Sequence, residues 1–307
     1  MTMWVCGEVL VDLIPEPGSS ERVGVIGGGP ENTAKALARL GHDVEFIDGI
    51  STDKWGVAAN AELDADCFGT RFCKFSDKPT CQAIVTLNEK GGATYEFVID
   101  GTATFDFGAD WLPDAYKHKP SLLHIGTLVT VIEPGASVLF DWALGVSELA
   151  PIIFDPNIRP AVMGDRDKYR AQVEKWCSIS SVVKVSDDDI SWLYPGEDHV
   201  DVAKRWIENG VTVVVITRGA DGIWGVTREG VVKVPGYKVD VVDTIGAGDT
   251  VGAVVAEAVK TIGLDELHGG ALIVSLEKAA RAAAITCSRK GANPPTLKEL
   301  QDINAIY

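Results

Sequence analysis

The first third of the chain alternates apolar and polar residues with the period of two that is typical of β-strands. Residues 3–14 and 21–26 follow this alternation, which predicts extended segments. Over residues 30–40 the spacing of apolar residues changes to that of a helix, and Gly41 ends the pattern. The chain is therefore expected to open with strands and one helix joined by short connections.

Two further segments, 81–88 and 93–99, alternate on either side of the polar stretch Glu89-Lys90-Gly91-Gly92. This arrangement predicts a β-hairpin with one apolar and one polar face. We expect the hairpin to join the opening strands in a small β-rich appendage, formed by about residues 10–27 and 79–101.

Short apolar runs alternate with helical patterns in the rest of the chain, which predicts a parallel sheet with helices on both faces. The runs fall at residues 121–126, 151–155, 181–185 and 211–217. Two long helical patterns, over residues 247–262 and 274–288, close the chain. Because no linker rich in Pro or Ser separates the two regions, residues 1–307 are expected to form one α/β domain that carries the appendage.

The composition is that of an ordinary globular protein, with 46% hydrophobic and 23% charged residues. There is no run of about 18 uncharged apolar residues, so no membrane-spanning segment is expected. The N-terminus has no basic region before its apolar stretch. We therefore interpret it as the first strand of the fold and not as an export signal, and expect a cytoplasmic protein.

The chain carries 44 acidic against 28 basic residues, a net charge of −16. This excess argues against nucleic-acid binding, in which Lys and Arg neutralise phosphates. A phosphate ligand would have to be held by local groups such as backbone N–H groups or magnesium, because the overall field repels it.

Cysteine and histidine residues give no strong sign of a metal or redox site. The six cysteines have neither C-x-x-C spacing nor zinc-ligand spacing from a histidine, and are Cys6, Cys67, Cys73, Cys81, Cys177 and Cys287. Reduced thiols are the expected state, and a redox site among Cys67, Cys73 and Cys81 is the alternative. We expect His124, inside an apolar strand, to be a hydrogen-bonded core residue and not a catalytic one.

The strongest chemical signal is the segment Val242–Thr250, which reads VDTIGAGDT and precedes a long helical pattern. A Gly-x-Gly turn at a helix start leaves N–H groups free to bind a phosphoryl group, and the helix dipole adds positive potential. Asp249 at this turn can accept the proton of a sugar hydroxyl. Alone, the turn could also be an ordinary glycine loop with an acidic helix cap.

A second glycine turn, Gly27-Gly28-Gly29, precedes the helical pattern of residues 30–40. Its spacing matches neither the P-loop nor the dinucleotide-binding fingerprint. Glycines allow a ligand to approach the backbone closely, and Asn32 supplies both a donor and an acceptor for a polyol.

Together the two turns resemble the paired signatures of the PfkB/ribokinase family of carbohydrate kinases, and bacterial fructokinase-type members in particular. The segments between them that share the resemblance are Gly7-Glu8 with Asp12, HIGTLVTVIEPGA (124–136), DPNIRP (155–160), KVSDDDISWLYPG (184–196), TRGADG (217–222) and TCSRKGANPP (286–295). The resemblance implies a ribokinase-like three-layer α/β/α core with a mostly parallel sheet and a small β-sheet lid. It also implies transfer of the γ-phosphoryl of Mg-ATP to a sugar hydroxyl.

The resemblance assigns roles residue by residue. It implies that Asp249 is the general base and that the amides of Gly246, Ala247 and Gly248 form the anion hole. The sugar-binding residues that it implies are Asp12, Gly28, Asn32 and Arg159. The nucleotide-binding residues that it implies are Lys184, Thr217, Arg218, Gly219, Gly222, Ala283, Thr286 and Asn293.

Three of these roles have ordinary structural alternatives. Asp12 could be a strand-end carboxylate in solvent, although an acid within VLVDLI needs a partner. Arg159 could be a surface residue of a loop bounded by prolines. Gly222 could serve only a tight turn.

The resemblance also implies metal ions. Magnesium would be organised through water by an Asn-x-x-Glu motif, whose positions here read Ser186-x-x-Asp189, so the carboxylate is kept and the amide is lost. Asp243 matches a position associated with a monovalent cation, usually potassium, or is a simple strand-end cap.

Two departures from the family pattern bear on the substrate. Many relatives have an arginine in the lid where Ile99 or Asp100 stands here. Without that cation a carboxylate-bearing sugar loses a partner, which favours a neutral ketose such as fructose. Glu31 replaces a residue that is often small, and would either contact a sugar hydroxyl or face solvent.

Two other functions remain open at this point. The acceptor could be 2-keto-3-deoxygluconate, ribose or a nucleoside, because a fold does not fix a substrate. Alternatively the chain could be a non-catalytic sugar- or nucleotide-binding module, although such a module needs no base at Asp249. An exposed edge of the lid could also pair with a second copy to form a homodimer.

Overall fold

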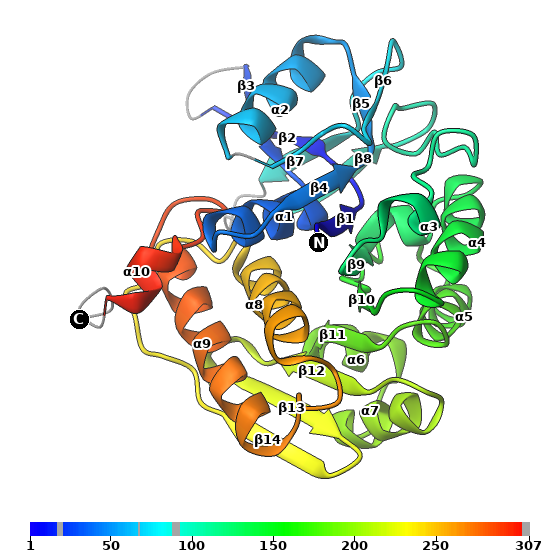
Figure 1. Cartoon of the computed structure of the whole chain (residues 1–307). Coiled ribbons are helices and arrows are strands. Elements are labelled where there is room, and N and C mark those ends of the chain that lie inside the picture. The colour runs from blue at the N-terminus through cyan, green and yellow to red at the C-terminus, as the bar shows by residue number, and fades with distance from the viewer. Residues whose placement is uncertain (17–20, 67, 88–92, 303–307) are drawn as a thin grey trace.

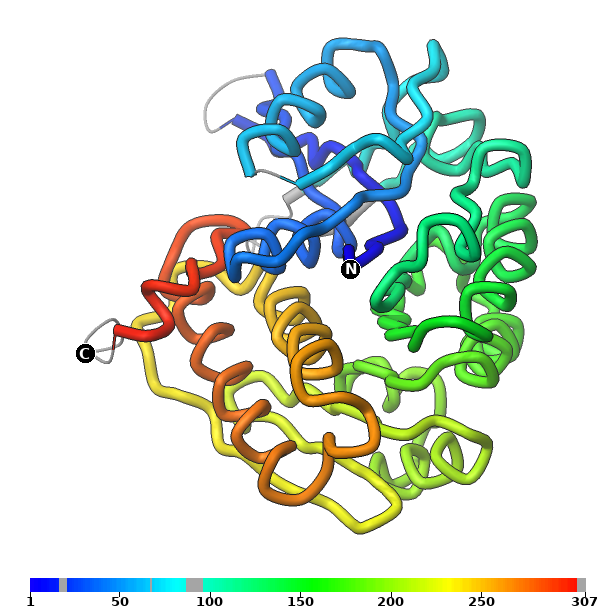
Figure 2. Tube along the Cα trace, in the orientation of Figure 1, coloured from blue at the N-terminus to red at the C-terminus, as the bar shows by residue number. Residues whose placement is uncertain are grey.

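In the computed structural model, which describes residues 1–16, 21–66, 68–87 and 93–302, an eight-stranded sheet runs through the molecule (Figures 1 and 2). Its strands, in spatial order, are β14 (Gly230–Val234), β13 (Ile223–Thr227), β12 (Val213–Thr217), β11 (Val182–Ser186), β10 (Ile152–Asp155), β9 (Leu122–Gly126), β1 (Met3–Cys6) and β4 (Val44–Ile47). Neighbours from β12 to β4 are parallel, as predicted. The antiparallel strands β13 and β14 had not been predicted.

Helices cover both faces of this sheet, so the core has two layers of apolar side chains. The helices that pack on one face are α1 (Gly29–Arg39), α8 (Ala247–Ile262), α9 (Gly269–Cys287) and α10 (Leu297–Gln301). The helices that pack on the other face are α4 (Gly135–Ser147), α5 (Arg166–Cys177), α6 (Asp187–Leu193) and α7 (His199–Glu208). This arrangement is the three-layer α/β/α core that the sequence predicts.

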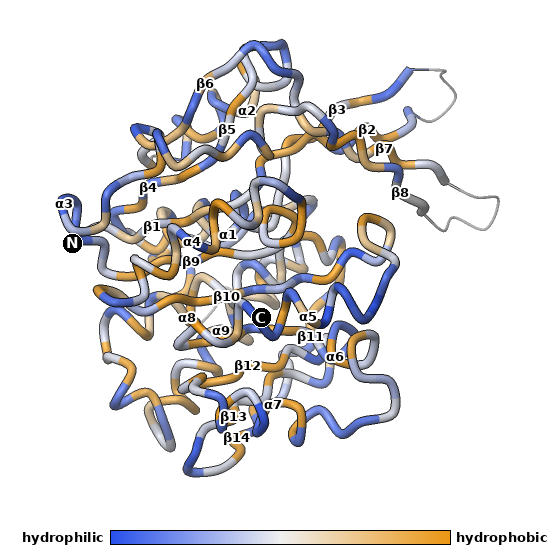
Figure 3. Tube along the Cα trace, turned by 90° about the vertical axis from the view of Figure 1, so that its right-hand side faces the viewer, coloured by the Kyte–Doolittle hydropathy of each residue, from blue (hydrophilic) through white to orange (hydrophobic). Residues whose placement is uncertain are grey.

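The central strands are mostly apolar because both of their faces are covered. Figure 3 shows these strands as the hydrophobic interior of the molecule. Three polar residues interrupt them on the face that α8 covers: His124 on β9, Asp155 at the end of β10 and Lys184 on β11. Polar side chains at this depth need partners, so their position marks the region where chemistry is expected.

A second, smaller sheet projects from the core (Figure 3). Its strands, in order, are β3 (Arg22–Gly27), β2 (Leu10–Pro15), β7 (Gln82–Leu87) and β8 (Ala93–Val98). The strands β7 and β8 are antiparallel, as the hairpin pattern predicts, and the predicted turn at 89–92 lies outside the described residues. The extended segment predicted over residues 3–14 is two strands, since the chain leaves the large sheet after Cys6 and enters the small one at Leu10.

The remaining elements connect or support the two sheets. They are α2 (Lys54–Ala65), α3 (Ala115–His118), β5 (Gly49–Ser51), β6 (Lys74–Ser76) and the short 3-10 helices η1 (Thr127–Thr130) and η2 (Gly219–Asp221). Helix α2 lies against β3, where the ring of Trp55 occupies the space that a side chain at Gly24 would need.

Asp48 joins three of the connections between the two sheets. This fully buried carboxylate accepts hydrogen bonds from the amide of Val9 (2.8 Å), the amide of Gly49 (2.7 Å) and the hydroxyl of Thr104 (3.3 Å). Burial raises its pKa well above the usual value, and the two amide bonds act in the opposite direction. The chain segments that link the small sheet to the core are therefore held together at one point.

None of the helices in the described part of the chain is both long and apolar enough to span a bilayer. The described cysteines, Cys6, Cys73, Cys81, Cys177 and Cys287, are unpaired, and Cys67 lies outside the described residues. Burial raises the pKa of the Cys73 and Cys81 thiols, which keeps them protonated and unreactive.

We predict that Gly49→Ala destabilises the protein, because an added Cβ would lie 1.9 Å from the Ala103 carbonyl oxygen. Such overpacking against backbone should lower the free energy of unfolding by at least about 1–3 kcal/mol, as measured by urea denaturation. The matched control is Gly145→Ala in α4, where nothing lies within 4 Å and the better helix propensity should add about 0.5–1 kcal/mol. Equal stability of the two variants would contradict the close approach at the junction.

Candidate active site

The start of α8 forms an anion-binding turn. Gly246 caps the helix in the left-handed conformation (φ 76°), and an added Cβ there would lie 2.7 Å from the Cβ of Ala292. The Ala247 amide donates to the carbonyl of Thr244 (3.3 Å), whereas the amides of Gly248 and Asp249 have no acceptor among the described residues. With the helix dipole behind them, these free N–H groups suit a phosphoryl oxygen.

Asp249 is buried in the first turn of this helix, with 7% of its surface exposed. Its Oδ2 accepts a hydrogen bond from Nδ2 of Asn32 on α1 (2.8 Å). Burial raises the pKa of Asp249 to about 6, although the positive charge of Lys184 and the bond from Asn32 lower it in part. The carboxylate is therefore a stronger base than a solvent-exposed aspartate and is still mostly ionised at neutral pH.

The glycine turn before α1 separates Asp249 from Asp12. An added Cβ at Gly29 would lie 3.3 Å from Oδ1 of Asp249, and one at Gly27 would lie 3.3 Å from Oδ2 of Asp12. At Gly28 (φ 137°) an added Cβ would be only 2.2 Å from the Glu8 carbonyl oxygen. The turn thus places bare backbone between two carboxylates, which leaves a ligand free to approach both of them.

Arg159 lies near both of these carboxylates, and Asn32 is hydrogen-bonded to one of them. The charge of Arg159 opposes the effect of burial, which raises the pKa of both Asp12 and Asp249. Its guanidinium donates to Oδ1 of Asn157 (2.6 Å) and is otherwise exposed. The structure therefore brings together the residues that the sequence assigns to sugar binding. Asp12 itself is half-buried, so it is not a strand-end carboxylate in solvent.

Lys184 and Asp155 form a buried ion pair beneath the anion-binding turn, with 2.8 Å between Nζ and Oδ2. Lys184 Nζ lies 3.0 Å from the position that a Cβ of Gly248 would take. The negative charges of Asp155 and Asp249 raise the pKa of Lys184 despite its burial, so the lysine stays charged. Lys184 therefore lies below the anion-binding turn, and it does not line the pocket beside that turn.

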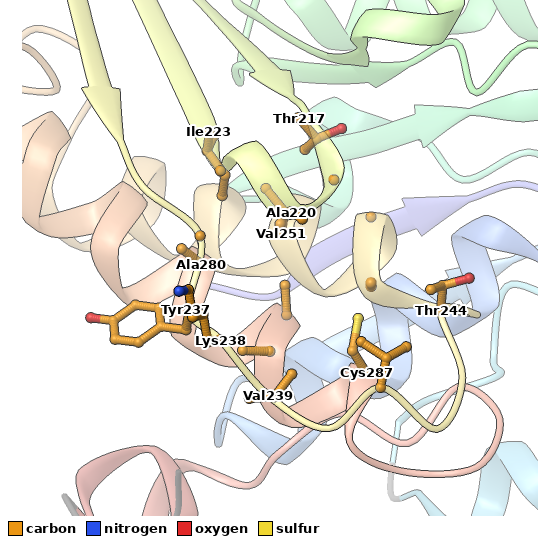
Figure 4. Close-up of a pocket in the computed structure, with 18 residues that line it drawn as sticks. Thr217, Ala220, Ile223, Tyr237, Lys238, Val239, Thr244, Val251, Ala280 and Cys287 are labelled. Carbon is orange, nitrogen blue, oxygen red and sulfur yellow. The ribbon is translucent and has the colours of Figure 1, made fainter. Parts of the chain in front are cut away.

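A pocket of about 760 Å³ opens beside the start of α8 (Figure 4). Its lining residues are Thr217, Gly219, Ala220, Gly222, Ile223, Gly236, Tyr237, Lys238, Val239, Val241, Thr244, Ala247, Gly248, Val251, Ala280, Ala283, Ala284 and Cys287. Most of these side chains are apolar, and the pocket extends to Gly248 of the anion-binding turn. Its size and lining suit a nucleotide whose phosphates reach that turn.

Four of the predicted nucleotide residues, Thr217, Gly219, Gly222 and Ala283, line this pocket. Gly222 also makes a tight turn (φ 96°), where an added Cβ would lie 2.1 Å from the Val234 carbonyl oxygen. Both of the roles considered for this glycine are thus compatible with its position.

Three other predicted nucleotide residues do not line the pocket. Arg218 stacks on Trp224, with its guanidinium carbon 4.0 Å from the ring centre. Thr286 is fully buried and its hydroxyl lies 3.0 Å from that of Thr250. Asn293 accepts a hydrogen bond from Arg39 (2.6 Å), so its side chain is already used.

The two residues predicted to organise cations are both engaged with backbone amides. Asp189 is buried and accepts hydrogen bonds from the amides of Ile158 (2.9 Å) and Ser186 (3.1 Å), the latter as part of a capping box of α6. Asp243 accepts from the amides of Ile245 (3.1 Å) and Gly291 (2.9 Å), which ties the anion-binding loop to the C-terminal loop.

Two expectations from the sequence are wrong. Glu31 neither faces solvent nor contacts the site, because it is fully buried and its Oε1 lies 3.2 Å from Nζ of Lys35. His124 is a core residue, but neither of its ring nitrogens has a hydrogen-bond partner among the described residues. Burial, with the charge of Lys184 nearby, lowers the pKa of His124 to about 3, so the ring is neutral.

Sequence reasoning did not single out several residues of the site. Asp155 and Asn157 lie in the DPNIRP segment, directly after a buried strand, where the carboxyl ends of parallel strands collect ligand-binding groups. That rule could have found both. The stretch 236–241, which forms one wall of the pocket, carries no comparable signal because its contribution is backbone and apolar surface.

A buried carboxylate beside a turn with free amides, with further polar groups nearby and an apolar pocket that reaches the same turn, is an arrangement typical of a phosphotransferase site. Comparisons with known proteins agree. Residues 3–299 match the description "pfkB family carbohydrate kinase". The chain therefore belongs to the pfkB family of carbohydrate kinases.

Individual relatives extend this result. A fructokinase of Rhizobium leguminosarum bv. trifolii is 34% identical over 279 residues, which cover 90% of this chain and 84% of that protein. The structure of a fructokinase from Xylella fastidiosa with bound ATP superposes with a TM-score of 0.87 at 24% identity, covering 97% of this chain and 96% of that one. An aminoimidazole riboside kinase from Salmonella enterica, in complex with its riboside and an ATP analogue, gives a TM-score of 0.83 at 23% identity, covering 98% of each chain.

We predict that kcat/KM for the sugar falls about tenfold per pH unit below a pH of about 6. The base must be ionised to accept a proton, and Asp249, whose pKa is raised to about 6, becomes protonated as the pH falls through that value. A pH–rate profile on the folded enzyme tests this, with far-UV circular dichroism at each pH as the control. An acid limb near pH 4, the ordinary value for aspartate, would contradict the raised pKa.

Proposed function

We propose that this protein transfers the γ-phosphoryl group of ATP to a primary hydroxyl of a ketose, and that fructose is its substrate. The observation that carries the proposal is the position of Asp249, buried between the anion-binding turn and the glycine turn. A module that only binds sugar or nucleotide has no need of a buried carboxylate with a raised pKa at this point.

In the proposed reaction the sugar hydroxyl oxygen forms a bond to the γ-phosphorus as the bond between that phosphorus and the ADP oxygen breaks. Asp249 accepts the hydroxyl proton, and Asn32 holds its carboxylate in place. The free amides of Gly248 and Asp249 face the developing negative charge on the phosphoryl oxygens. Lys184 adds a buried positive charge directly below them.

The apolar pocket fits the nucleoside part of ATP. Its walls offer apolar contact from residues such as Val239, Val251 and Ala280, and its far end is the anion-binding turn. The Xylella fastidiosa relative, whose fold this chain shares, was determined with ATP bound. Both observations support ATP as the phosphoryl donor.

Magnesium would be held mainly by the phosphates and by water. The described residues contain no group of three or more His, Cys, Asp or Glu side chains that could hold a metal on their own. Asp155 Oδ1 is buried and has no hydrogen-bond partner within the described part of the chain. Asp189 already accepts two amide hydrogen bonds, so a water would be a further donor to it. Mg²⁺ commonly binds in this manner, and it would offset charge on the phosphates.

A monovalent cation at Asp243 is a further part of the proposal.

We propose that the small sheet acts as a lid over the sugar. Asp12 on β2 faces Gly27 at the edge of the site, and its partial burial suits a group that holds sugar hydroxyls. A lid would exclude water and so suppress hydrolysis of ATP. Its edge strand β3 exposes Val23 and Val25, which supports a homodimer formed through this sheet.

Two observations favour fructose as the acceptor. At the lid position where many relatives carry an arginine, Ile99 packs against the core and supplies no cation for a carboxylate. The Rhizobium leguminosarum relative, at 34% identity, is a fructokinase. The unpaired described cysteines also fit a reducing compartment, and we propose that the enzyme acts in the cytoplasm.

Asp249→Asn should reduce kcat by roughly 10²–10⁴, because the amide cannot accept the proton while its size is unchanged. Binding of ATP should change little. The measurement is steady-state ADP release with fructose, with thermal unfolding to show that the variant is folded. A folded variant with near-normal kcat would remove Asp249 from the role of base.

A panel of acceptors tests the substrate. Coupled ADP-release assays with Mg-ATP and potassium should compare fructose, tagatose, ribose, 2-keto-3-deoxygluconate, adenosine and fructose 6-phosphate. We expect fructose to give the highest kcat/KM, at or above about 10⁴ M⁻¹s⁻¹. A preference for another sugar or for the nucleoside would keep the phosphotransfer mechanism and overturn the choice of fructose.

A further inference from the structure

Glu8 is a buried acid beside the proposed sugar site for which the mechanism above has no use. It lies in the connection between β1 and β2, and only 3% of its surface is exposed. Burial raises its pKa to about 7, and the charge of Arg159 acts in the opposite direction. Burying an acid at this depth lowers the stability of the fold unless hydrogen bonds or an opposite charge offset the cost. Acids that are kept buried are often found at functional sites, so the contacts of Glu8 are informative.

The side chain of Glu8 makes one hydrogen bond to a side chain. Its Oε1 accepts from the hydroxyl of Thr127, the first residue of η1, and its Oε2 has no partner among the described residues. The backbone of Glu8 also touches the glycine turn, because its carbonyl oxygen lies 2.2 Å from the position that a Cβ of Gly28 would take. Glu8 therefore connects the end of β9 to the turn on which the sugar is proposed to rest.

Thr127 has a left-handed backbone with a φ of 60°. This conformation is uncommon for a β-branched residue and costs about 1–3 kcal/mol, so the surrounding structure must hold it. In the structure the Thr127 hydroxyl donates its hydrogen bond to Glu8. Strained residues of this kind are concentrated at functional sites.

The position of Thr127 matters for the site because its methyl group packs against the glycine turn. Cγ2 of Thr127 lies 3.0 Å from the position that a Cβ of Gly29 would take, and Nδ2 of Asn157 and Oδ1 of Asp249 lie 3.0 Å and 3.3 Å from the same point. Thr127 is thus one of three side chains that surround Gly29, and a shift of Thr127 would change the space between the turn and the base.

We propose that Glu8 is a positioning residue for the sugar: it holds Thr127 in its left-handed conformation, and Thr127 in turn fixes the glycine turn relative to Asp249. Glu8 touches neither of the reacting groups in this role. The inference rests on the proposed function for its kinetic consequences, whereas its structural consequence can be observed without a substrate.

The kinetic test compares Glu8→Ala, Glu8→Gln and Thr127→Val. Loss of the hydrogen bond in Glu8→Ala and Thr127→Val should raise KM for fructose about tenfold and leave KM for ATP within about twofold. Glu8→Gln should restore KM for fructose, because its amide oxygen can still accept the Thr127 hydroxyl. The acid limb near pH 6 should persist in Glu8→Gln, since that limb is assigned to Asp249.

Two controls separate positioning from a general loss of stability. Glu174→Ala removes a different carboxylate, which accepts a hydrogen bond from the hydroxyl of Tyr194 on the opposite face of the sheet. It should lower the melting temperature without changing either KM. In the double variant Glu8→Ala/Thr127→Val, KM for fructose should equal that of the worse single variant, because both changes break the same bond. The proposal would be overturned if KM for fructose rose about a hundredfold in the double variant, which is the product of two independent tenfold effects. It would also be overturned if KM for fructose and KM for ATP rose equally.

A crystal structure of Glu8→Ala decides the question independently of activity. Thr127 should leave the left-handed region and the glycine turn should shift away from Asp249. If Thr127 keeps a φ near 60° and Gly29 does not move, Glu8 does not position the turn. If the wild-type enzyme phosphorylates none of the sugars, the proposed function fails, and the crystal structure still tests the role of Glu8.

Discussion

The hydrogen bond between Asn32 and Asp249 is the contact on which the rest of the site depends. It joins residues that are 217 positions apart and that lie in the first turns of two helices, α1 and α8. The two helices approach closely at Gly252 of α8, where an added Cβ would lie 3.9 Å from the hydroxyl oxygen of Thr33 on α1. At Gly252, an added Cβ would lie 3.3 Å from Nε2 of His124. The close contact of α1 and α8 places the base, the glycine turn and the anion-binding turn within a few ångströms of one another.

This arrangement requires polar groups in a region that apolar packing would otherwise fill. Lys184, Asp155 and His124 interrupt three central strands on the face toward α8, and Asp249 is buried above them. Buried ion pairs are weak sources of stability, because removing two charges from water offsets much of their attraction. The Lys184–Asp155 pair is better understood through the proposed function: it keeps a positive charge under the anion-binding turn. The charge of Lys184 limits how far burial raises the pKa of Asp249, whereas the charge of Asp155 raises that pKa further.

Much of the fold could be predicted because parallel strands covered on both faces are continuous apolar runs, which are visible in sequence. The strands β9 to β12 and the helices α8 and α9 follow from this pattern. The hairpin β13–β14 does not, because its alternation is short and resembles a loop. The break at Gly7–Val9 was missed because β1 and β2 are both mostly apolar and read as one extended segment.

The grouping of the candidate site could be predicted where particular side chains or glycines define a motif, since Asp249, Asn32 and the two turns do lie together. It was not predictable where contact comes from backbone or apolar surface, as along the stretch 236–241. The burial of Glu31 depends on Lys35 one turn later and on the packing of α2, which is a tertiary property. The prediction for Thr286 failed for a similar reason. It lies on α9, which lines the pocket with other residues, but its own side chain faces the interior.

The most direct test of the central claim, that Asp249 is the base that receives the sugar proton, is a crystal structure with fructose and a non-hydrolysable ATP analogue. If Asp249 is the base, a primary hydroxyl of the sugar should lie about 2.6–3.2 Å from its carboxylate, with the γ-phosphate at the amides of Gly248 and Asp249. A sugar bound with every hydroxyl beyond hydrogen-bonding distance of Asp249, or a γ-phosphate held away from the start of α8, would contradict the claim.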